Sequence, residues 1–107
     1  MFAFINANTS PSAKLMFLNT NFGFWCEREY LADSAFEASQ MNELIRSAGS
    51  QSGLASLLAR QGITHILYAN VDWKIPYPPY LFDFLNRETN VVAQTEDGQL
   101  TLHEIRR

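Results

Sequence analysis

The chain has 107 residues, of which 47% are hydrophobic and 13% aromatic, so it has the size of one folded domain and not of two. Its formal net charge is −3 and its Lys and Arg residues are scattered, which argues against nucleic acid as a partner because a phosphate backbone calls for clustered cations. Cys26 is the only cysteine and no spacing typical of metal ligands is present, so we expect no intramolecular disulfide and no metal. We also expect no cofactor, because "NFGFW" offers a single glycine, whereas a dinucleotide or phosphate loop needs several.

The first part of the chain is predicted to contain a short lead-in and a buried strand. Residues 2–13 indicate a short helix or an extended segment that ends at the turn before Pro11. Residues 15–18 are four consecutive apolar residues, too few for a helix and not alternating with polar ones. Such a run is typical of a strand buried on both faces, as in a parallel sheet, so we expect a strand over residues 14–19.

Two helices are predicted to follow, after residue 36. The first has an apolar stripe with helical spacing, formed by Met41, Leu44, Ile45 and Ala48. Gly49 ends this helix, and Ser50 or Ser52 is the N-cap of the second. The second helix continues the same period with Leu54, Leu57 and Leu58, and Gly62 ends it.

A second apolar run, "ITHILYA", lies at residues 63–69, directly after the second helix. A helix, a glycine and a buried strand make up the second half of a βαβ unit. We therefore expect residues 63–69 to lie beside residues 14–19 and parallel to them, with a right-handed crossover. The segment "VDWKIPYPPY" is predicted to be irregular because prolines interrupt helices and sheets alike, and Pro78 and Pro79 are placed at the start of a third helix.

The last residues, 91–105, are predicted to form a β-hairpin with Asp97-Gly98 as its two-residue turn. This turn pairs Thr95 with Leu100, Ala93 with Leu102, and Val92 with His103. Residues 1–107 are therefore predicted to be a single α/β domain. It would consist of a small Rossmann-like βαβ unit with a mixed sheet, a C-terminal β-hairpin, and helices packed on the sheet.

The carboxyl ends of the two apolar strands are the predicted place for a ligand, because the loops of a parallel α/β sheet gather there. The loops are Asn19 to Phe24 and Asn70 to Tyr77. Together with the residues that follow the first loop, they supply Asn19, Asn21, Trp25, Arg28, Tyr30, Asn70, Asp72, Trp73 and Lys74 as candidate binding residues. Amides, a carboxylate and tryptophan rings in one crevice are typical of a surface that contacts carbohydrate. The alternative is an aromatic-rich loop that caps the core or docks on a neighbour.

Catalytic readings of the same region are weaker. One hypothesis is a thiol nucleophile formed by Cys26 with His65 or His103 and Asp33. However, no family signature surrounds the cysteine. We also expect His65 to be buried within a strand and His103 to lie on an exposed hairpin. Glu27 and Glu29 flank Arg28, a pattern that favours an edge strand protected by charge over acid–base chemistry. We assign no catalytic residue.

Three segments of the chain resemble a known family. Asn6 to Leu18 resembles the family's "N-x-x-T-P-x-x-A-K-V-L-F-L" but departs from it at Ser10, Leu15 and Met16. Gly23 to Tyr30 matches "G-[FY]-[WY]-x-x-R-x-Y". Gly62 to Asn70 resembles "G-I-T-H-[IV]-L-[VY]-N", with Ala69 as an additional residue before Asn70. In this order they are similar to the C-terminal soluble region of bacterial polytopic membrane proteins of the glycosyltransferase-C class, the dolichyl-phosphate-mannose-protein mannosyltransferase-like proteins.

The resemblance implies a role and a location. The chain would be a domain excised from the C-terminus of a larger integral membrane protein, on the extracytoplasmic (periplasmic) face of a bacterial inner membrane. It would be a non-catalytic accessory domain of a glycosyltransferase that uses polyprenyl-phosphate-sugar donors. Its partners would be the membrane-embedded part of its own parent chain and a glycan or lipid-linked acceptor. The alternative is a free-standing α/β module that binds a small molecule or a glycan.

Overall fold

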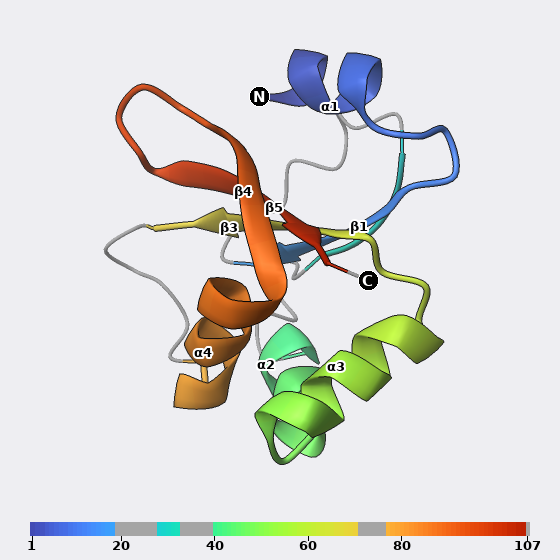
Figure 1. The fold of residues 1–107 in the computed structure, drawn as a ribbon, viewed down its shortest axis with the longest axis vertical. Coiled ribbons are helices and arrows are strands. Elements are labelled where there is room, and N and C mark those ends of the chain that lie inside the picture. The colour runs from blue at the N-terminus through green and yellow to red at the C-terminus, as the bar shows by residue number, and fades with distance from the viewer. Residues whose placement is uncertain (19–27, 33–39, 71–76, 107) are drawn as a thin grey trace.

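Helices and strands follow one another along the chain as expected for an α/β domain. The computed structural model describes residues 1–18, 28–32, 40–70 and 77–106 (Figure 1). In chain order its elements are α1 (Phe2–Asn8), β1 (Lys14–Leu18), β2 (Glu29–Ala32), α2 (Gln40–Ser47), α3 (Gln51–Arg60), β3 (His65–Ala69), α4 (Pro79–Glu88), β4 (Thr89–Gln94) and β5 (Leu100–Ile105). Of the two alternatives for residues 2–13, the structure contains the short helix.

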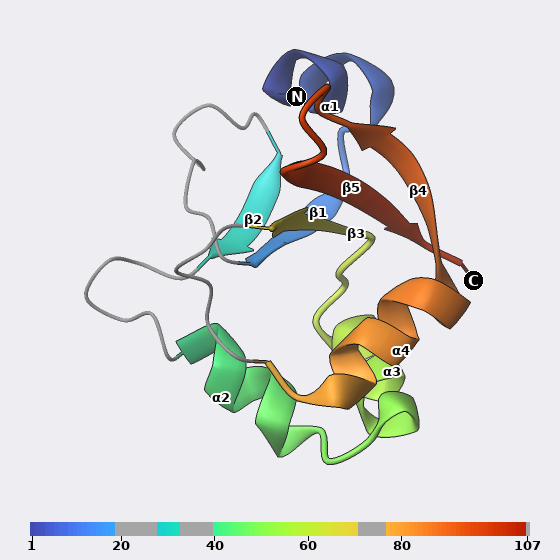
Figure 2. The same ribbon diagram turned by 90° about the vertical axis from the view of Figure 1, so that its left-hand side faces the viewer.

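The strands form one mixed sheet in the order β2-β1-β3-β5-β4. β1 is parallel to both of its neighbours, β2 and β3, whereas β5 is antiparallel to β3 and to β4. Helix α1 covers one face of the sheet, and α2, α3 and α4 cover the other (Figure 2). The predicted α/β fold, with a mixed sheet, a C-terminal hairpin and helices packed on the sheet, is confirmed.

The position of β1 explains its uninterrupted run of apolar residues. Leu15 and Phe17 are buried in one cluster, together with Ile5 of α1. Met16 and Leu18 are buried in a second cluster on the opposite face, among side chains of α2, α3 and α4. Because helices cover both faces, each of these side chains leaves water completely, which stabilises the fold by roughly 1.5–3 kcal/mol per side chain.

β3 lies beside β1 and parallel to it, as predicted, with Leu15 opposite His65 and Leu18 opposite Tyr68. The connection between the two strands differs from a simple βαβ unit. From β1 the chain first forms β2, on the far side of β1, and α2 and α3 then lead from β2 to β3. The helices that precede β3 therefore connect it to the edge strand β2, and β1 lies between these two strands in the sheet.

β2 is an edge strand, as the charged residues around Glu29 predicted. Within the described residues it spans four, "EYLA". Lys14 of β1 lies opposite Glu29, and its Nζ is 3.7 Å from the Glu29 Oε1. A short strand with an ion pair at its start is a poor template for pairing with another chain.

The ends of α2 and α3 coincide closely with the predicted residues. Gly49 and Gly62 have φ angles of 75° and 73°, a left-handed conformation that glycine adopts without strain. Ser50, rather than Ser52, is the N-cap of α3, and its Oγ accepts a hydrogen bond from the Gly53 N–H at 3.0 Å. The three predicted leucines of α3 are buried, and the side chain of Met41 in the α2 stripe lies outside the described residues.

The turn of the C-terminal hairpin is longer than predicted. It spans residues 96–99 and is closed by a hydrogen bond from the Thr95 N–H to the Leu100 carbonyl oxygen, at 3.0 Å. Asp97 holds this loop, because its Oδ1 accepts from the Thr95 hydroxyl at 2.6 Å and from the Gln99 N–H at 3.0 Å. These two hydrogen bonds lower the pKa of the Asp97 carboxyl. Gly98 adopts a φ of 71° within the loop.

The register of the hairpin is confirmed near the turn and wrong farther along. Ala93 lies opposite Leu102, as predicted. A β-bulge then interrupts the ladder between Val91 and Ala93, so that Val91, and not Val92, lies opposite His103. An extra residue on one strand shifts every pair beyond it by one position, which a two-residue turn counted from Asp97-Gly98 does not reveal.

Candidate functional site

The carboxyl ends of β1 and β3 meet at one edge of the sheet, which is the geometry on which the predicted binding site depended. The two strands pair in parallel from Leu15 and His65 to Leu18 and Tyr68. From β1 the chain continues to β2 on one side, and from β3 it continues through α4 to β4 on the other side. Successive connections that leave in opposite directions form a topological switch point, where α/β sheets place their ligands.

Six of the nine candidate binding residues lie outside the described residues: Asn19, Asn21, Trp25, Asp72, Trp73 and Lys74. Of the remaining three, only Asn70 lies at the carboxyl edge. It follows β3 directly and is exposed, and its N–H donates to the Gln99 carbonyl oxygen at 2.7 Å. This hydrogen bond ties the end of β3 to the loop of the hairpin.

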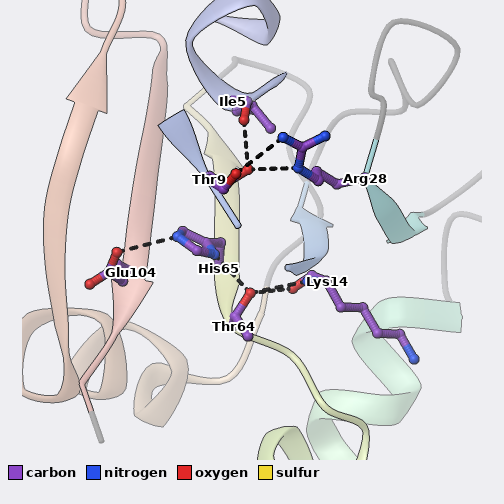
Figure 3. A network of polar contacts seen from close by, with 7 residues as sticks. All are labelled: Ile5, Thr9, Lys14, Arg28, Thr64, His65 and Glu104. Atoms are coloured by element: carbon purple, nitrogen blue, oxygen red, sulfur yellow. Dashed lines mark hydrogen bonds and ion pairs between the residues drawn. The ribbon is translucent and has the colours of Figure 1, made fainter. Parts of the chain in front are cut away.

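Arg28 lies at the opposite edge of the sheet from the predicted site. Its Nη2 donates to the carbonyl oxygens of Asn6 and Thr9, at 2.6 and 3.1 Å, and its Nε donates to the Thr9 Oγ1 at 3.1 Å. Figure 3 shows the guanidinium against the last turn of α1. The prediction is wrong because β2 runs parallel to β1, so the residue before β2 lies at the amino end of the strands, beside the start of β1.

Arg28 therefore has a structural role in the described part of the fold. The last carbonyl groups of a helix have no partner within the helix, and a cation at that end also interacts favourably with the helix dipole. The Thr9 hydroxyl additionally donates to the Ile5 carbonyl oxygen at 2.6 Å. Arg28 and Thr9 thus fix α1 to the amino end of β2.

Tyr30 also lies away from the carboxyl edge. It is opposite Leu15 in the register of β1 and β2, and its ring stacks on the ring of Phe17, with 5.2 Å between the centroids and 5° between the planes. Its side chain is 39% exposed. Tyr30 therefore covers a buried ring on the α1 face, on the same side of the sheet as Arg28 and away from Asn70 at the carboxyl edge.

His65 is buried and hydrogen-bonded, as predicted, although it begins β3 rather than lying in the middle of a strand. Its Nδ1 is 2.8 Å from the Thr64 Oγ1, and its Nε2 is 3.4 Å from the Glu104 Oε2 (Figure 3). Burial lowers the pKa of His65, and the Glu104 carboxylate partly opposes this shift. The imidazole is therefore favoured in its neutral form by the core and in its charged form by one carboxylate.

A hydroxyl, an imidazole and a carboxylate in a row look like a catalytic triad, but the Thr64 hydroxyl has other partners. It accepts from the Lys14 N–H at 3.1 Å and also lies 3.2 Å from the Lys14 carbonyl oxygen. Its single proton goes either to that oxygen or to the His65 Nδ1. The hydroxyl thus joins the starts of β1 and β3, at the edge opposite to the switch point, and this arrangement is explained by the fold.

His103 is buried, with 8% of its surface exposed, so the prediction that it lies on an exposed hairpin is wrong. β5 is an inner strand of the sheet, between β3 and β4, and not the outer strand of a hairpin. The His103 Nδ1 is 3.0 Å from the Thr89 Oγ1 and its Nε2 is 3.0 Å from the Thr101 Oγ1. Because the Thr89 hydroxyl donates to the Leu85 carbonyl oxygen, its oxygen accepts from the His103 Nδ1–H.

Both histidines are therefore bonded within the fold, which weakens the thiol-nucleophile hypothesis. Burial lowers the pKa of His103 and favours the neutral ring that its two threonine partners satisfy. Cys26 and Asp33, the other members of the proposed trio, lie outside the described residues.

Two aromatic residues at the carboxyl edge were not among the candidates. Tyr68 is the fourth residue of β3, and Phe82 lies in the first turn of α4. Their rings form an edge-to-face pair with 5.9 Å between the centroids and 90° between the planes. Phe82 falls outside the buried stripe of α4, and a large apolar residue on the polar side of an amphipathic helix is a signal that the sequence offers.

Among the residues that the structure describes, no group of three or more His, Cys, Asp or Glu side chains could hold a metal ion. Within the same residues, no helix has the length and apolar character needed to cross a bilayer. A scan against protein-family models, a search of the curated proteins and a search of the solved structures each found no match.

Proposed function

We propose that this chain is a non-catalytic accessory domain of a membrane glycosyltransferase that uses polyprenyl-phosphate-sugar donors. Its place would be the extracytoplasmic face of a bacterial inner membrane, where it contacts the glycan or lipid-linked acceptor and the membrane-embedded part of its own parent chain. The support for the family is the resemblance of Asn6 to Leu18, Gly23 to Tyr30 and Gly62 to Asn70.

One observation supports the non-catalytic role most strongly. The described side chains best suited to acid–base chemistry, His65 and His103, each have both ring nitrogens engaged with neighbouring side chains of the fold. Arg28, the described candidate best suited to binding an anion, is bonded to α1. A general base must reach the proton of its substrate, and a cationic site must reach its anion. These groups hold the fold together instead.

The test compares the natural full-length product with residues 1–107 alone. The full-length product should transfer a sugar from a polyprenyl-phosphate carrier to an acceptor, and residues 1–107 alone should not. A His65→Gln substitution in the full-length product should leave kcat within a few-fold of wild type, because His65 would have no catalytic role. Transfer by residues 1–107 alone, or a full-length product that transfers no sugar, would contradict the proposal.

The second candidate function is a free-standing module that binds a small molecule or a glycan. The observation that favours it is the topological switch point between β1 and β3, which is present whatever the rest of the parent protein is. This candidate expects a glycan or a nucleotide to raise the Tm of the isolated domain. If no ligand of a broad panel of both classes raises the Tm, the candidate is rejected.

A further inference from the structure

Tyr68 and Phe82 form an edge-to-face aromatic pair, and Phe82 is one of the exposed large apolar residues of the described fold. Phe82 is 37% exposed, although it lies on a helix whose buried positions Leu81, Phe84 and Leu85 already contact the core. Its neighbour Tyr68 is partly buried against the same core cluster. The contact with Tyr68 therefore places the Phe82 ring at the surface in a defined edge-to-face arrangement.

The Tyr68 hydroxyl gives this surface a polar group. A tyrosine phenol is neutral near pH 7, and burial raises the pKa of Tyr68 further from that range, so its hydroxyl has a proton to donate. Within the described residues, Tyr68 makes its ring contact with Phe82 and no hydrogen bond through its hydroxyl. A partly buried phenol that bonds no group among the described residues is available to a ligand, both as a donor and as an acceptor.

The pair lies at the switch point. Tyr68 is opposite Leu18 of β1 and Thr101 of β5, so it is one residue from the carboxyl end of β3. Asn70 is exposed two residues farther along the chain. The strand ends thus bring an aromatic ring and a neutral hydroxyl to the edge of the sheet where α/β folds place their ligands.

The chemistry of the pair selects one class of ligand. Tyr68 and Phe82 offer a ring and a hydroxyl and no formal charge, whereas a phosphate or a carboxylate ligand would call for a cation. Rings that stack on pyranose faces, with neutral groups that bond hydroxyls, suit a saccharide. We propose that Tyr68 and Phe82 bind a neutral saccharide, with the Phe82 ring against a face of the sugar and the Tyr68 hydroxyl bonded to one of its hydroxyls. This inference rests on the proposed function, in which the domain contacts a glycan acceptor.

The test is an NMR titration of residues 1–107 with three neutral probes: cellobiose, methyl mannopyranoside and N,N′-diacetylchitobiose. At least one probe should shift the aromatic resonances of Tyr68 and Phe82, with a Kd on the order of 1 mM. Phe82→Ala should raise this Kd about 3- to 10-fold by removing the stacking surface, and Tyr68→Phe should raise it by a similar factor by removing one hydrogen bond. If none of the three probes shifts these resonances, the inference is overturned.

A matched control separates the pair from exposed apolar surface in general. Val91 is 54% exposed on β4, and Val91→Ala should leave the Kd unchanged. An equal loss of affinity in Val91→Ala and Phe82→Ala, at unchanged Tm, also counts against the inference. This test and the glycosyl-transfer test can fail separately. Sugar binding without transfer by the full-length product would reject the proposed function alone. Transfer without sugar binding at Tyr68 and Phe82 would reject the inference alone.

Discussion

At the scale of single residues, Arg28, His65 and His103 stabilise the fold through hydrogen bonds to neighbouring elements. Arg28 crosses from the start of β2 to the last turn of α1 and donates three hydrogen bonds there. His103 is held between two threonine hydroxyls, and His65 between a threonine and a carboxylate. Buried polar groups that are satisfied in this way cost a great deal when one partner is removed, because the other partner is left without a bond.

Arg28→Ala should therefore destabilise the domain. The substitution leaves the carbonyl oxygens of Asn6 and Thr9 without their charged donor, and hydrogen bonds to charged groups contribute about 1.5–3 kcal/mol each before water replaces part of them. We expect the free energy of unfolding, measured by urea denaturation, to fall by about 2 kcal/mol. Arg60→Ala, an exposed arginine at the end of α3, is the control and should change it by less than about 0.5 kcal/mol. Equal effects of the two substitutions would show that Arg28 does not hold α1.

The buried histidines should make stability depend on pH. Burial lowers the pKa of His103 and of His65 below 6.5 in the folded state, so the unfolded chain binds protons more readily. Their contribution to stability is complete above about pH 6.5 and is lost as the pH falls toward the lowered pKa values.

Urea denaturation at about pH 7.5 and about pH 5.5 measures this effect. The free energy of unfolding should be lower at the acidic pH for the wild type, and the difference should be smaller for His103→Gln, in which one of the two groups no longer titrates. His65→Gln should also reduce it, but less, because Glu104 opposes the pKa shift of His65. A wild-type stability that is the same at both values would refute this account of the histidines.

At the scale of elements, local sequence patterns located most helices and strands. They did not predict which strands pair or in what register. Runs of apolar residues located β1 and β3, and capping residues located α2 and α3. The partners of β2 could not be predicted, because four residues with a mixed pattern do not indicate which neighbour they join or in which direction. The bulge at Val92 was missed for a related reason, since an extra residue in a ladder has no local signature.

The tight connection between α2 and α3 offers an element-scale prediction. Alanine is normally favoured over glycine within a helix by about 1 kcal/mol. At Gly53, however, a Cβ would lie 2.0 Å from the Ala48 carbonyl oxygen, a backbone atom that cannot move aside alone. Gly53→Ala should therefore lower the free energy of unfolding by about 1–3 kcal/mol, as overpacking does.

The control for this prediction is on the same helix. Ser56 is exposed in α3, and Ser56→Ala should leave the free energy of unfolding unchanged or raise it slightly. If Gly53→Ala and Ser56→Ala have the same effect on the free energy of unfolding, a Cβ at residue 53 does not clash with the Ala48 carbonyl oxygen, and the prediction is wrong.

At the scale of the whole molecule, the sequence predicted the edge of the sheet where a ligand would lie better than it predicted the residues there. The parallel pairing of β1 with β3 follows from two buried runs separated by helices, so the edge could be located. Arg28 and Tyr30 were assigned to it because the direction of β2 was not known, and the structure places Arg28 at the other edge. Tyr68 and Phe82 were missed because their contact joins a strand and a helix, and only the folded chain brings them together.

The central claim is that this domain works as part of a membrane-embedded glycosyltransferase. The most direct measurement is the isolation of the natural product from its own cells with an antibody against residues 1–107, followed by fractionation and mass determination. We expect a chain much longer than 107 residues that leaves the membrane fraction only when detergent is added. A product of 107 residues that is recovered from the soluble fraction without detergent would contradict the claim.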